Sequence, residues 1–229
     1  MNEKSEKPKW RTPKSSRAKL KIPKKSSKHF VGQTTFGEDK GQGQCLGFGS
    51  MVEHNASLLL IYAPGIVDVE EQIDPVFYLG ADGKTHPRWF DFRVTKIGGS
   101  RAVCDVKNNQ RAEMADYRDG MDRVAAAAIP GTADKVFVVS ERNIKPERLQ
   151  RVKLFHGCRF PQPDLDQKLE QFIASFSGQA VLRDLLASAE LGNDGFHAAV
   201  RLIRRGILLV AEDVRITLSC VVSKEEVAK

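Results

Sequence analysis

The sequence predicts an α/β protein in which a mixed sheet flanked by helices is followed by a smaller domain of three helices and a β-hairpin. Three observations predict this order. Strand-like and helical segments alternate over residues 30–157, a turn-rich linker follows at 157–163, and three amphipathic helices then lead into two short strands. A basic segment precedes both domains. We therefore expect a basic tail at 1–29, an α/β domain at 30–157 and a C-terminal domain at 158–229.

The composition is that of a folded protein rather than a disordered one. Of the 229 residues, 41% are hydrophobic and 28% are charged. The longest apolar run, 57–67, is interrupted by Pro64 and Gly65 and falls short of the roughly 18 residues that cross a bilayer. We therefore expect no membrane partner. The four cysteines are scattered, without a CxxC, and we see no secretory signal, which predicts reduced thiols in a bacterial cytoplasm.

The positive charge of the chain is concentrated at its N-terminus. Residues 1–28 hold 11 of the 36 Lys and Arg but only two of the 29 Asp and Glu, so they carry +9 and the rest of the chain −2. With few large apolar side chains, this tail is expected to be disordered when free. It is either a solubilising extension or an arm that neutralises nucleic-acid phosphates, and we favour the arm. Its candidate DNA contacts are Lys14, Arg17, Lys19, Lys21, Lys24 and Lys25.

The elements of the first domain follow from local signals. A Gly- and Gln-rich stretch at 30–49 predicts a loop, and Ser50 is the expected N-cap of a helix over 50–62, which Pro64 and Gly65 end. Turn signals separate four expected strands, at 66–70, 74–79, 89–95 and 101–107. A helix at 111–128, a buried strand at 135–140 and a short helix at 146–155 complete the domain.

The C-terminal domain is predicted from three helices and a hairpin. The helices are expected at 165–174, 179–188 and 194–205, and the strands at 206–210 and 214–222. This order is the winged-helix pattern, a variant of the helix-turn-helix. On the third helix, Arg201, Arg204 and Arg205 are expected to share the outer face. They either contact DNA or form an ordinary solvated basic face.

One acid-x-lysine pair stands out by its position in the chain. Such pairs occur four times, but only Asp105 and Lys107 follow an apolar run that reads as a strand, where charges need a partner. If the strands around Gly98-Gly99 pair, Asp91 falls opposite Val106, give or take one position. In either neighbouring register Asp91, Asp105 and Lys107 share one face. Two facing carboxylates repel each other unless a cation lies between them, and such oxygen ligands suit Mg²⁺.

Other polar residues have two interpretations. Glu53 completes a capping box with Ser50 or supplies a third carboxylate to the site. Glu70 or Glu71 is the alternative third carboxylate. For Gln72 we favour a strand-edge amide over a part of the metal site. His156 and Cys158 lack a second pair at zinc spacing, so we expect them to be structural.

The order of these residues resembles a known group of enzymes. A helical Glu, a Phe-Asp on one strand and an Asp-x-Lys on the next resemble the restriction-endonuclease-like PD-(D/E)xK nucleases. Within that group, the resemblance is to TnsA-type endonuclease subunits of heteromeric transposases. The segments that carry it are Ser50-Met-Val-Glu53, Glu71-Gln72, Phe90-Asp91-Phe92 and Cys104-Asp-Val-Lys107, together with the winged-helix-like domain. Phe90 replaces the proline of the motif, and Asp105 replaces the usual Glu or Gln.

The resemblance implies a fold, a site and a reaction. The first domain would have the restriction-endonuclease-like fold, with Glu53, Asp91 and Asp105 as ligands of Mg²⁺, or alternatively Mn²⁺, and Lys107 as the catalytic cation. Glu53 is preferred as third ligand because the resemblance places it on a helix. Phosphodiester hydrolysis would follow, in which the metal lowers the pKa of the attacking water and Lys107 orients that water or offsets charge on the phosphate.

The resemblance also implies a cellular task. The enzyme would cut the 5′ ends of a transposon in double-stranded DNA. An integrase-like transposase of the TnsB type would cut and join the 3′ ends, and an AAA+ ATPase of the TnsC type would link both to the target. Two alternatives remain: a stand-alone PD-(D/E)xK nuclease of defence or repair, and a non-catalytic winged-helix DNA-binding protein.

Overall fold

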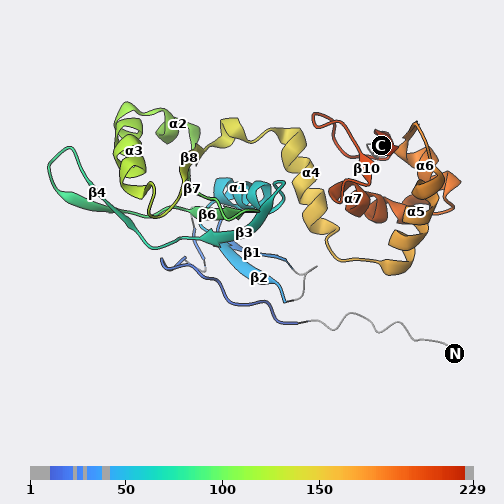
Figure 1. Cartoon of the computed structure of the whole chain (residues 1–229), viewed down its shortest axis with the longest axis horizontal. Coiled ribbons are helices and arrows are strands. Elements are labelled where there is room, and N and C mark those ends of the chain that lie inside the picture. The colour runs from blue at the N-terminus through green and yellow to red at the C-terminus, as the bar shows by residue number, and fades with distance from the viewer. Residues whose placement is uncertain (1–10, 23–24, 28–29, 38–41, 225–229) are drawn as a thin grey trace.

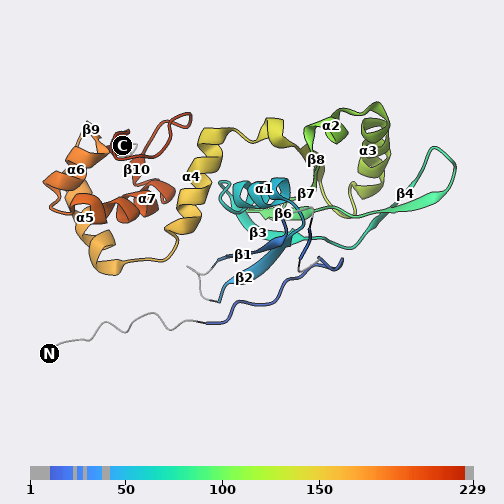
Figure 2. The same cartoon turned by 180° about the vertical axis from the view of Figure 1, so that it is seen from behind.

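The computed structural model describes residues 11–22, 25–27, 30–37 and 42–224. Two lobes lie side by side along the long axis, with helix α4 (Pro146–Gly157) between them (Figures 1 and 2). The larger lobe holds the main sheet and helices α1 to α3, and the smaller lobe holds α5 to α7. No helix among these described residues has the length and apolar character needed to cross a membrane.

A four-stranded mixed sheet forms the centre of the larger lobe. Its order is β3-β6-β7-β8, with antiparallel pairing except between β7 and β8. The strands span Ile66–Glu71, Phe92–Lys96, Arg101–Val106 and Lys135–Val139. The predicted α/β class with a mixed sheet flanked by helices is confirmed. Strand β8 lies at the edge and is only half-buried, because only one neighbour covers it.

Helices cover both faces of this sheet. Helix α1 (Met51–Ile61) packs on one face through a cluster that includes Ala56, Phe92 and Val94. Helix α3 (Ala115–Ala128) packs on the other through a cluster that includes Val103 and Met121. Since side chains alternate along a strand, β7 and β8 contribute to both cores, whereas the core residues of β3 and β6 belong to the cluster on the α1 face.

The pairing of β6 with β7 determines where the candidate residues lie. Phe92 pairs with Cys104 and Thr95 with Arg101. This is one of the registers expected from the turn at Gly98-Gly99, and it brings Asp91, which directly precedes β6, to the level of Asp105.

A two-stranded ribbon projects from the larger lobe (Figure 1). It pairs β4 (Val76–Leu79) with β5 (Thr85–Arg88). Strand β5 was not expected, and the strand expected over 89–95 begins only at Phe92. The sequence Thr-His-Pro-Arg shows no apolar alternation, so it becomes a strand through its partner rather than through its own pattern.

The glycine-rich stretch at 30–49 is not a loop, and that expectation is wrong. Strand β1 (Gly32–Phe36) pairs with β2 (Gln44–Phe48), whose last three residues are buried. The glycines make close packing possible: a Cβ on Gly47 would come within 2.5 Å of Ile22, and one on Gly32 within 2.8 Å of the Phe48 ring. Glycine in a strand often marks such a close approach rather than a loop.

The tail expected to be disordered is ordered where the structure describes it. Residues 11–22, called the N-terminal strap below, run beside β2 and β3. The Lys14 amide donates to the Gly43 carbonyl at 2.7 Å, and the Lys19 amide donates to the Gln72 carbonyl at 2.8 Å. The expectation failed because the partners of the strap lie far away in the sequence. Residues 1–10, 23–24 and 28–29, and with them Lys24, lie outside the described residues.

The helix expected over 111–128 is two helices. Asn108 caps α2 (Asn109–Glu113), and the extended backbone of Met114 separates it from α3. A short 3-10 turn, η2 (Glu141–Asn143), then leads from β8 into α4.

The smaller lobe has a core of its own, lined by α5 (Pro163–Ser175), α6 (Leu182–Ser188) and α7 (Phe196–Arg204). A 3-10 turn, η3 (Gly192–Gly195), precedes α7. Its three-stranded sheet has the order β10-β11-β9. The strands are β9 (Gln179–Val181), β10 (Leu208–Leu209) and β11 (Val221–Lys224).

The expected bounds in this lobe need two corrections. The second helix starts at Leu182 because the preceding residues pair with β11. The hairpin strands are shorter than expected, since only Leu208 and Leu209 pair with β11 and a long loop separates the two strands.

Candidate active site

Three of the four predicted catalytic residues meet where β6 begins and β7 ends. The Lys107 ammonium lies 3.2 Å from Asp105 Oδ1 and 3.6 Å from Asp91 Oδ2. It also donates to the Val106 carbonyl at 2.8 Å. One cation is therefore surrounded by three oxygens, two from carboxylates and one from the main chain.

Asp91 is held by donors on both of its carboxylate oxygens. Gln72 donates through Nε2 to Oδ1 at 3.0 Å, and the Val106 amide donates to Oδ2 at 2.7 Å. Burial raises the pKa of Asp91 to about 6, against the attraction of Lys107, and the charges of Asp105 and Glu53 add to the rise. Gln72 is therefore part of the site, and the interpretation as a mere strand-edge amide is wrong.

Asp105 is almost completely buried, at 1% exposure, and three side chains donate to its carboxylate. Its Oδ2 accepts from the Arg88 guanidinium and from the Tyr117 hydroxyl, and its Oδ1 accepts from Lys107. Burial and this hydrogen bond raise the pKa of Tyr117. The Tyr117 ring also lies 5.6 Å from the Arg88 guanidinium and 5.5 Å from that of Arg111.

Sequence reasoning missed Arg88 and Tyr117. Arg88 is the last residue of β5, whose sequence shows no strand pattern. Tyr117 lies on the buried face of α3, where a tyrosine is ordinarily interpreted as a core residue. Neither is close in sequence to the residues it contacts. The only available signal was the buried Asp105 itself, which needed cationic or hydroxyl donors from somewhere in the fold.

Glu53 caps its own helix. Its carboxylate accepts from the Gly49 amide at 2.8 Å and from the Ser50 hydroxyl at 3.0 Å, while its own amide donates to Ser50 Oγ at 3.1 Å. Ser50 therefore caps the helix, and Glu53 reaches back to the amide of Gly49, one residue before the N-cap, in a variant of the capping box. Glu53 is close enough for its charge to raise the pKa of Asp91, yet its hydrogen bonds go to residues 49 and 50 rather than to the carboxylate cluster.

The other candidate third carboxylates have different partners. Glu71 is buried on the α1 face of the sheet, opposite Phe92, and accepts from the Ser16 hydroxyl through Oε1. Its Oε2 has no hydrogen-bond partner among the described residues. Glu70 pairs with Arg93 at 2.7 Å. Neither reaches the oxygens around Lys107.

The oxygens around Lys107 are chemically suited to a small divalent cation. Within the described residues, no three His, Cys, Asp or Glu side chains gather closely enough to hold a metal by themselves. Asp91, Asp105 and the Val106 carbonyl nevertheless offer three hard oxygen ligands to one point. Mg²⁺ is commonly held by one or two carboxylates together with waters. The donor set therefore fits such an ion once the flexible Lys107 side chain turns aside.

The predicted basic residues of the strap differ in their surroundings. Arg17 is committed to the protein, since its guanidinium grips Asp68 at 2.7 and 2.9 Å and the Val69 carbonyl at 2.7 Å. By contrast, four lysines of the N-terminal region have exposed side chains. They are Lys14, Lys19, Lys21 and Lys25.

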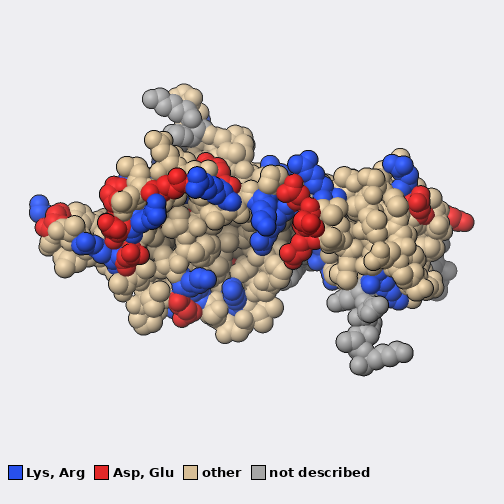
Figure 3. Space-filling model, turned by 90° about the horizontal axis from the view of Figure 1, so that it is seen from above, with Lys and Arg blue, Asp and Glu red and all other residues tan. Residues whose placement is uncertain are grey.

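The arginines of α7 do not form the expected outer face. Arg201 is only 8% exposed, and its guanidinium holds Asp166 at 2.6 Å. The expectation was wrong because the start of α5 covers this side of α7. Arg205 forms an exposed ion pair with Glu170, and Arg204 lies over the Tyr62 ring at 4.9 Å. On the face seen in Figure 3, basic and acidic side chains are interspersed rather than separated by sign.

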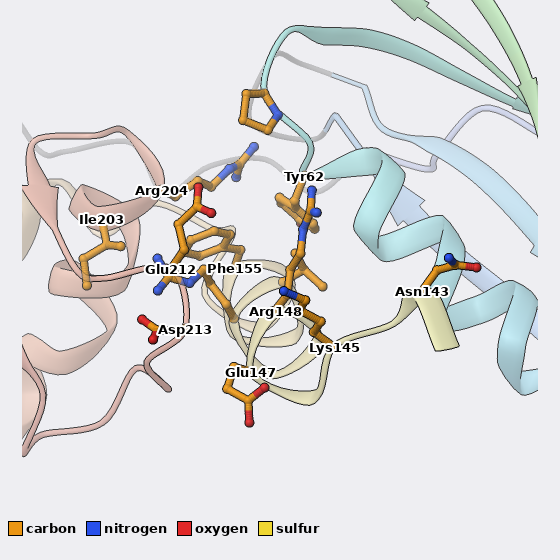
Figure 4. Close-up of a pocket in the computed structure, with 13 residues that line it drawn as sticks. Tyr62, Asn143, Lys145, Glu147, Arg148, Phe155, Ile203, Arg204, Glu212 and Asp213 are labelled. Atoms are coloured by element: carbon orange, nitrogen blue, oxygen red, sulfur yellow. The ribbon is translucent and has the colours of Figure 1, made fainter. Parts of the chain in front are cut away.

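A groove of about 600 Å³ lies between the lobes, away from the cluster of Asp91, Asp105 and Lys107 (Figure 4). Its apolar lining includes Phe155 from α4 and Ile203 from α7. Its charged lining is of both signs, with Lys145 and Arg148 near the start of α4 and Glu212 in the loop after β10. None of the four predicted catalytic residues lines it. The charged cluster at β6 and β7 is therefore a different place from this groove.

Comparison with protein families and with curated proteins found no match. The function of this protein therefore has to be inferred from the geometry of the cluster.

Proposed function

We propose that this protein is a divalent-metal-dependent DNA endonuclease whose site is built on Asp91, Asp105 and Lys107. The observation that carries the proposal is the meeting of the fully buried Asp105, the largely buried Asp91 and one ammonium at the ends of neighbouring strands. Burying such charges is expensive and is rarely needed for folding alone. Perturbed carboxylates with a specific cationic neighbour are typical of catalytic sites.

Each residue has a role that follows from its contacts. Asp91, Asp105 and the Val106 carbonyl would hold the metal, while Gln72 orients Asp91, and Arg88 with Tyr117 orients Asp105. The bound metal would supply Lewis-acid stabilisation of a phosphate oxygen and a water of lowered pKa. Lys107 would turn aside from the position of the metal, and its flexible side chain would keep the ammonium beside the site, where it can donate to a phosphate oxygen or orient the attacking water.

The architecture supports the more specific proposal of a TnsA-type subunit. The motif order resembles that group, and the main sheet with α1 and α3 on its faces is compatible with a restriction-endonuclease-like domain. The smaller lobe has the order helix, strand, two helices and two strands, and its three strands form one antiparallel sheet. This order supports a winged helix. The proposed partners are transposon-end DNA, a TnsB-type transposase and a TnsC-type ATPase.

The strap supports DNA as the substrate. It passes Gln72, which touches Asp91, and it carries the exposed side chains of Lys14, Lys19 and Lys21. A phosphate backbone that reaches Asp91 and Asp105 would pass close to this positive segment. Lysines that neutralise phosphates release counterions and so favour binding.

The test is metal-dependent cleavage by the purified chain and by a Lys107→Ala variant. In the presence of a TnsB-type transposase and a TnsC-type ATPase, we expect cutting of DNA that carries transposon ends with Mg²⁺ or Mn²⁺, none with EDTA, and none from the variant at unchanged circular dichroism. Arg93→Ala, which loses a partly exposed pair with Glu70 on the same sheet, is the matched control and should still cut. Cleavage by the Lys107 variant at the rate of the unaltered protein would defeat the assignment.

The same experiment separates the alternatives. Cutting of plain duplex DNA by the chain alone favours a stand-alone nuclease. Cutting only in the presence of a TnsB-type transposase and a TnsC-type ATPase favours the transposase subunit. Metal-independent DNA binding without cutting under any of these conditions favours a non-catalytic DNA-binding protein.

A further inference from the structure

Gln72 donates hydrogen bonds to Asp91 from both the main chain and the side chain of Gln72. The Gln72 amide donates to the Asp91 carbonyl at 2.9 Å, and its Nε2 donates to Oδ1 at 3.0 Å. The backbone of Gln72 has φ 44°, in the left-handed region that residues other than glycine seldom adopt. Such a conformation is strained and persists only where the surroundings hold it.

The N-terminal strap supplies part of that hold. The Lys19 amide donates to the Gln72 carbonyl at 2.8 Å. One residue earlier in β3, Glu71 accepts from the Ser16 hydroxyl, and Arg17 grips Asp68. The anchors of the strap therefore fall along β3, an edge strand of the main sheet, and end at Gln72.

The Ser16 contact is the most sensitive of these anchors. The Glu71 side chain is 1% exposed, its Oε2 has no hydrogen-bond partner among the described residues, and its only other donor there is the Gly47 amide at 3.4 Å. A buried carboxylate that loses its main donor is strongly destabilised. The strap therefore has to be docked on β3 for the buried Glu71 carboxylate to keep its main hydrogen-bond donor.

We infer that the N-terminal strap is a positioning element for Asp91. Its docking along β3 holds Gln72 in the left-handed conformation, and Gln72 holds Asp91 Oδ1, so that Oδ2 stays directed at the Val106 amide and at Lys107. Gln72 is a positioning residue in this scheme, and the segment 16–19 acts through it. The inference rests on the proposed catalytic role of Asp91, whereas the coupling itself is a structural property that can be measured without catalysis.

The experiment compares Ser16→Asp with Ser15→Asp. Both variants add one negative charge to the strap, so their effects on DNA electrostatics are matched. Ser16 faces the buried Glu71, whereas the Ser15 side chain is exposed and the Ser15 carbonyl accepts from Gln44. A new carboxylate at position 16 should repel Glu71 and displace the strap, and one at position 15 should not.

Amide hydrogen exchange measures the coupling directly. We expect the Gln72 and Val106 amides, which donate to Asp91, to exchange at least tenfold faster in Ser16→Asp than in Ser15→Asp. Amides in α7 serve as the control for global unfolding and should be unchanged in both. Equal exchange at Gln72 and Val106 in the two variants overturns the inference, whether or not the protein cuts DNA.

Kinetics then separate positioning from DNA contact. Because small misplacements of catalytic groups are costly, kcat for DNA cleavage should fall about tenfold to a hundredfold in Ser16→Asp with little change in KM. Gln72→Gly, which keeps the left-handed backbone accessible but removes the amide, should reproduce the loss with the strap intact. A rise in KM at unchanged kcat would overturn the inference. Absence of cleavage by the unaltered chain, both alone and with a TnsB-type transposase and a TnsC-type ATPase, would instead count against the proposed function.

Discussion

Asp91 is the residue in which burial and charge conflict most directly. Burial raises its pKa from 3.8 to about 6, although Lys107 lies 3.6 Å away. The folded protein therefore binds this proton more tightly than the unfolded chain does. The stability that this proton contributes is complete below about pH 4 and is lost as the pH rises through about 6.

This loss of stability with rising pH should be absent from the Asp91→Asn variant. In metal-free buffer the unaltered protein should lose up to about 3 kcal/mol of unfolding free energy through this group between pH 4 and pH 7, and the variant should not. The amide can still accept from Val106 and, after a flip of Gln72, donate to Gln72. Urea unfolding at both pH values measures the difference, and parallel pH profiles for the two proteins would contradict it.

Arg88 and Arg93 provide a second comparison at this scale. Arg88 pairs with the fully buried Asp105, whereas Arg93 pairs with the partly exposed Glu70. Removing one partner of a buried pair costs about 3–5 kcal/mol, and an exposed pair about 0–1 kcal/mol. Arg88→Met should therefore destabilise the protein clearly more than Arg93→Met, as measured by urea unfolding. Equal losses would mean that Asp105 does not depend on Arg88.

At the scale of elements, Arg201 fastens α7 to the start of α5. The Arg201 guanidinium joins Asp166 and Gln162 near the start of α5 and the Cys158 carbonyl, all within 3.3 Å. Arg205 makes only an exposed pair with Glu170. Arg201→Met should cost about 3 kcal/mol or more of stability and Arg205→Met less than about 1 kcal/mol. Thermal unfolding of both variants tests the ranking, and its reversal would refute this role of Arg201.

The strap makes a prediction about DNA binding. The side chains of Lys14, Lys19 and Lys21 are exposed, whereas the Arg17 side chain is bound to Asp68 of β3. Replacing the three lysines by alanine should make the negative slope of log K against log salt shallower by about 0.9 for each phosphate that is no longer neutralised. Fluorescence anisotropy with duplex DNA from low to moderate salt measures this slope. A slope identical to that of the unaltered protein would exclude the strap from the DNA interface.

At the scale of the whole molecule, α4 belongs to both lobes. His156 bonds through its two ring nitrogens to Thr34 of β1 and to Tyr62 at the end of α1, each at 3.0 Å. Phe155 and Cys158 instead pack in the core of the smaller lobe. The domain boundary predicted between 157 and 158 therefore separates Phe155 from the core of the smaller lobe, in which it is packed.

Two fragments test this shared helix. A fragment of residues 145–229 should be more stable than one of residues 158–229 by about 3 kcal/mol or more, because the shorter one leaves the space of Phe155 unfilled. Phe155→Ala in the longer fragment should remove most of that advantage. Urea unfolding of the three proteins is the measurement. Equal stability of the two fragments would place the boundary where the sequence suggested.

Features with local causes could be predicted from the sequence alone. The Ser50 cap with Glu53, the stop at Pro64-Gly65 and the turn at Gly98-Gly99 depend on residues within a few positions of one another, and their elements appear as expected. The period of two along a strand then sufficed to place Asp91, Asp105 and Lys107 near one another. The α/β class was determined in the same way, by signals that a short window of chain contains.

Only the tertiary structure decided which partners these residues have. Arg88, Tyr117 and Gln72 reach the carboxylates from three different elements, Ser16 reaches Glu71 across 55 positions, and Arg201 turns inward to Asp166. The strap looked like a free tail in the sequence because contacts such as those of Ser16 and Arg17 are with strand residues more than 50 positions away, which composition does not reveal. Local propensity determines where elements begin and end, whereas the satisfaction of buried charge is settled only when those elements meet in space.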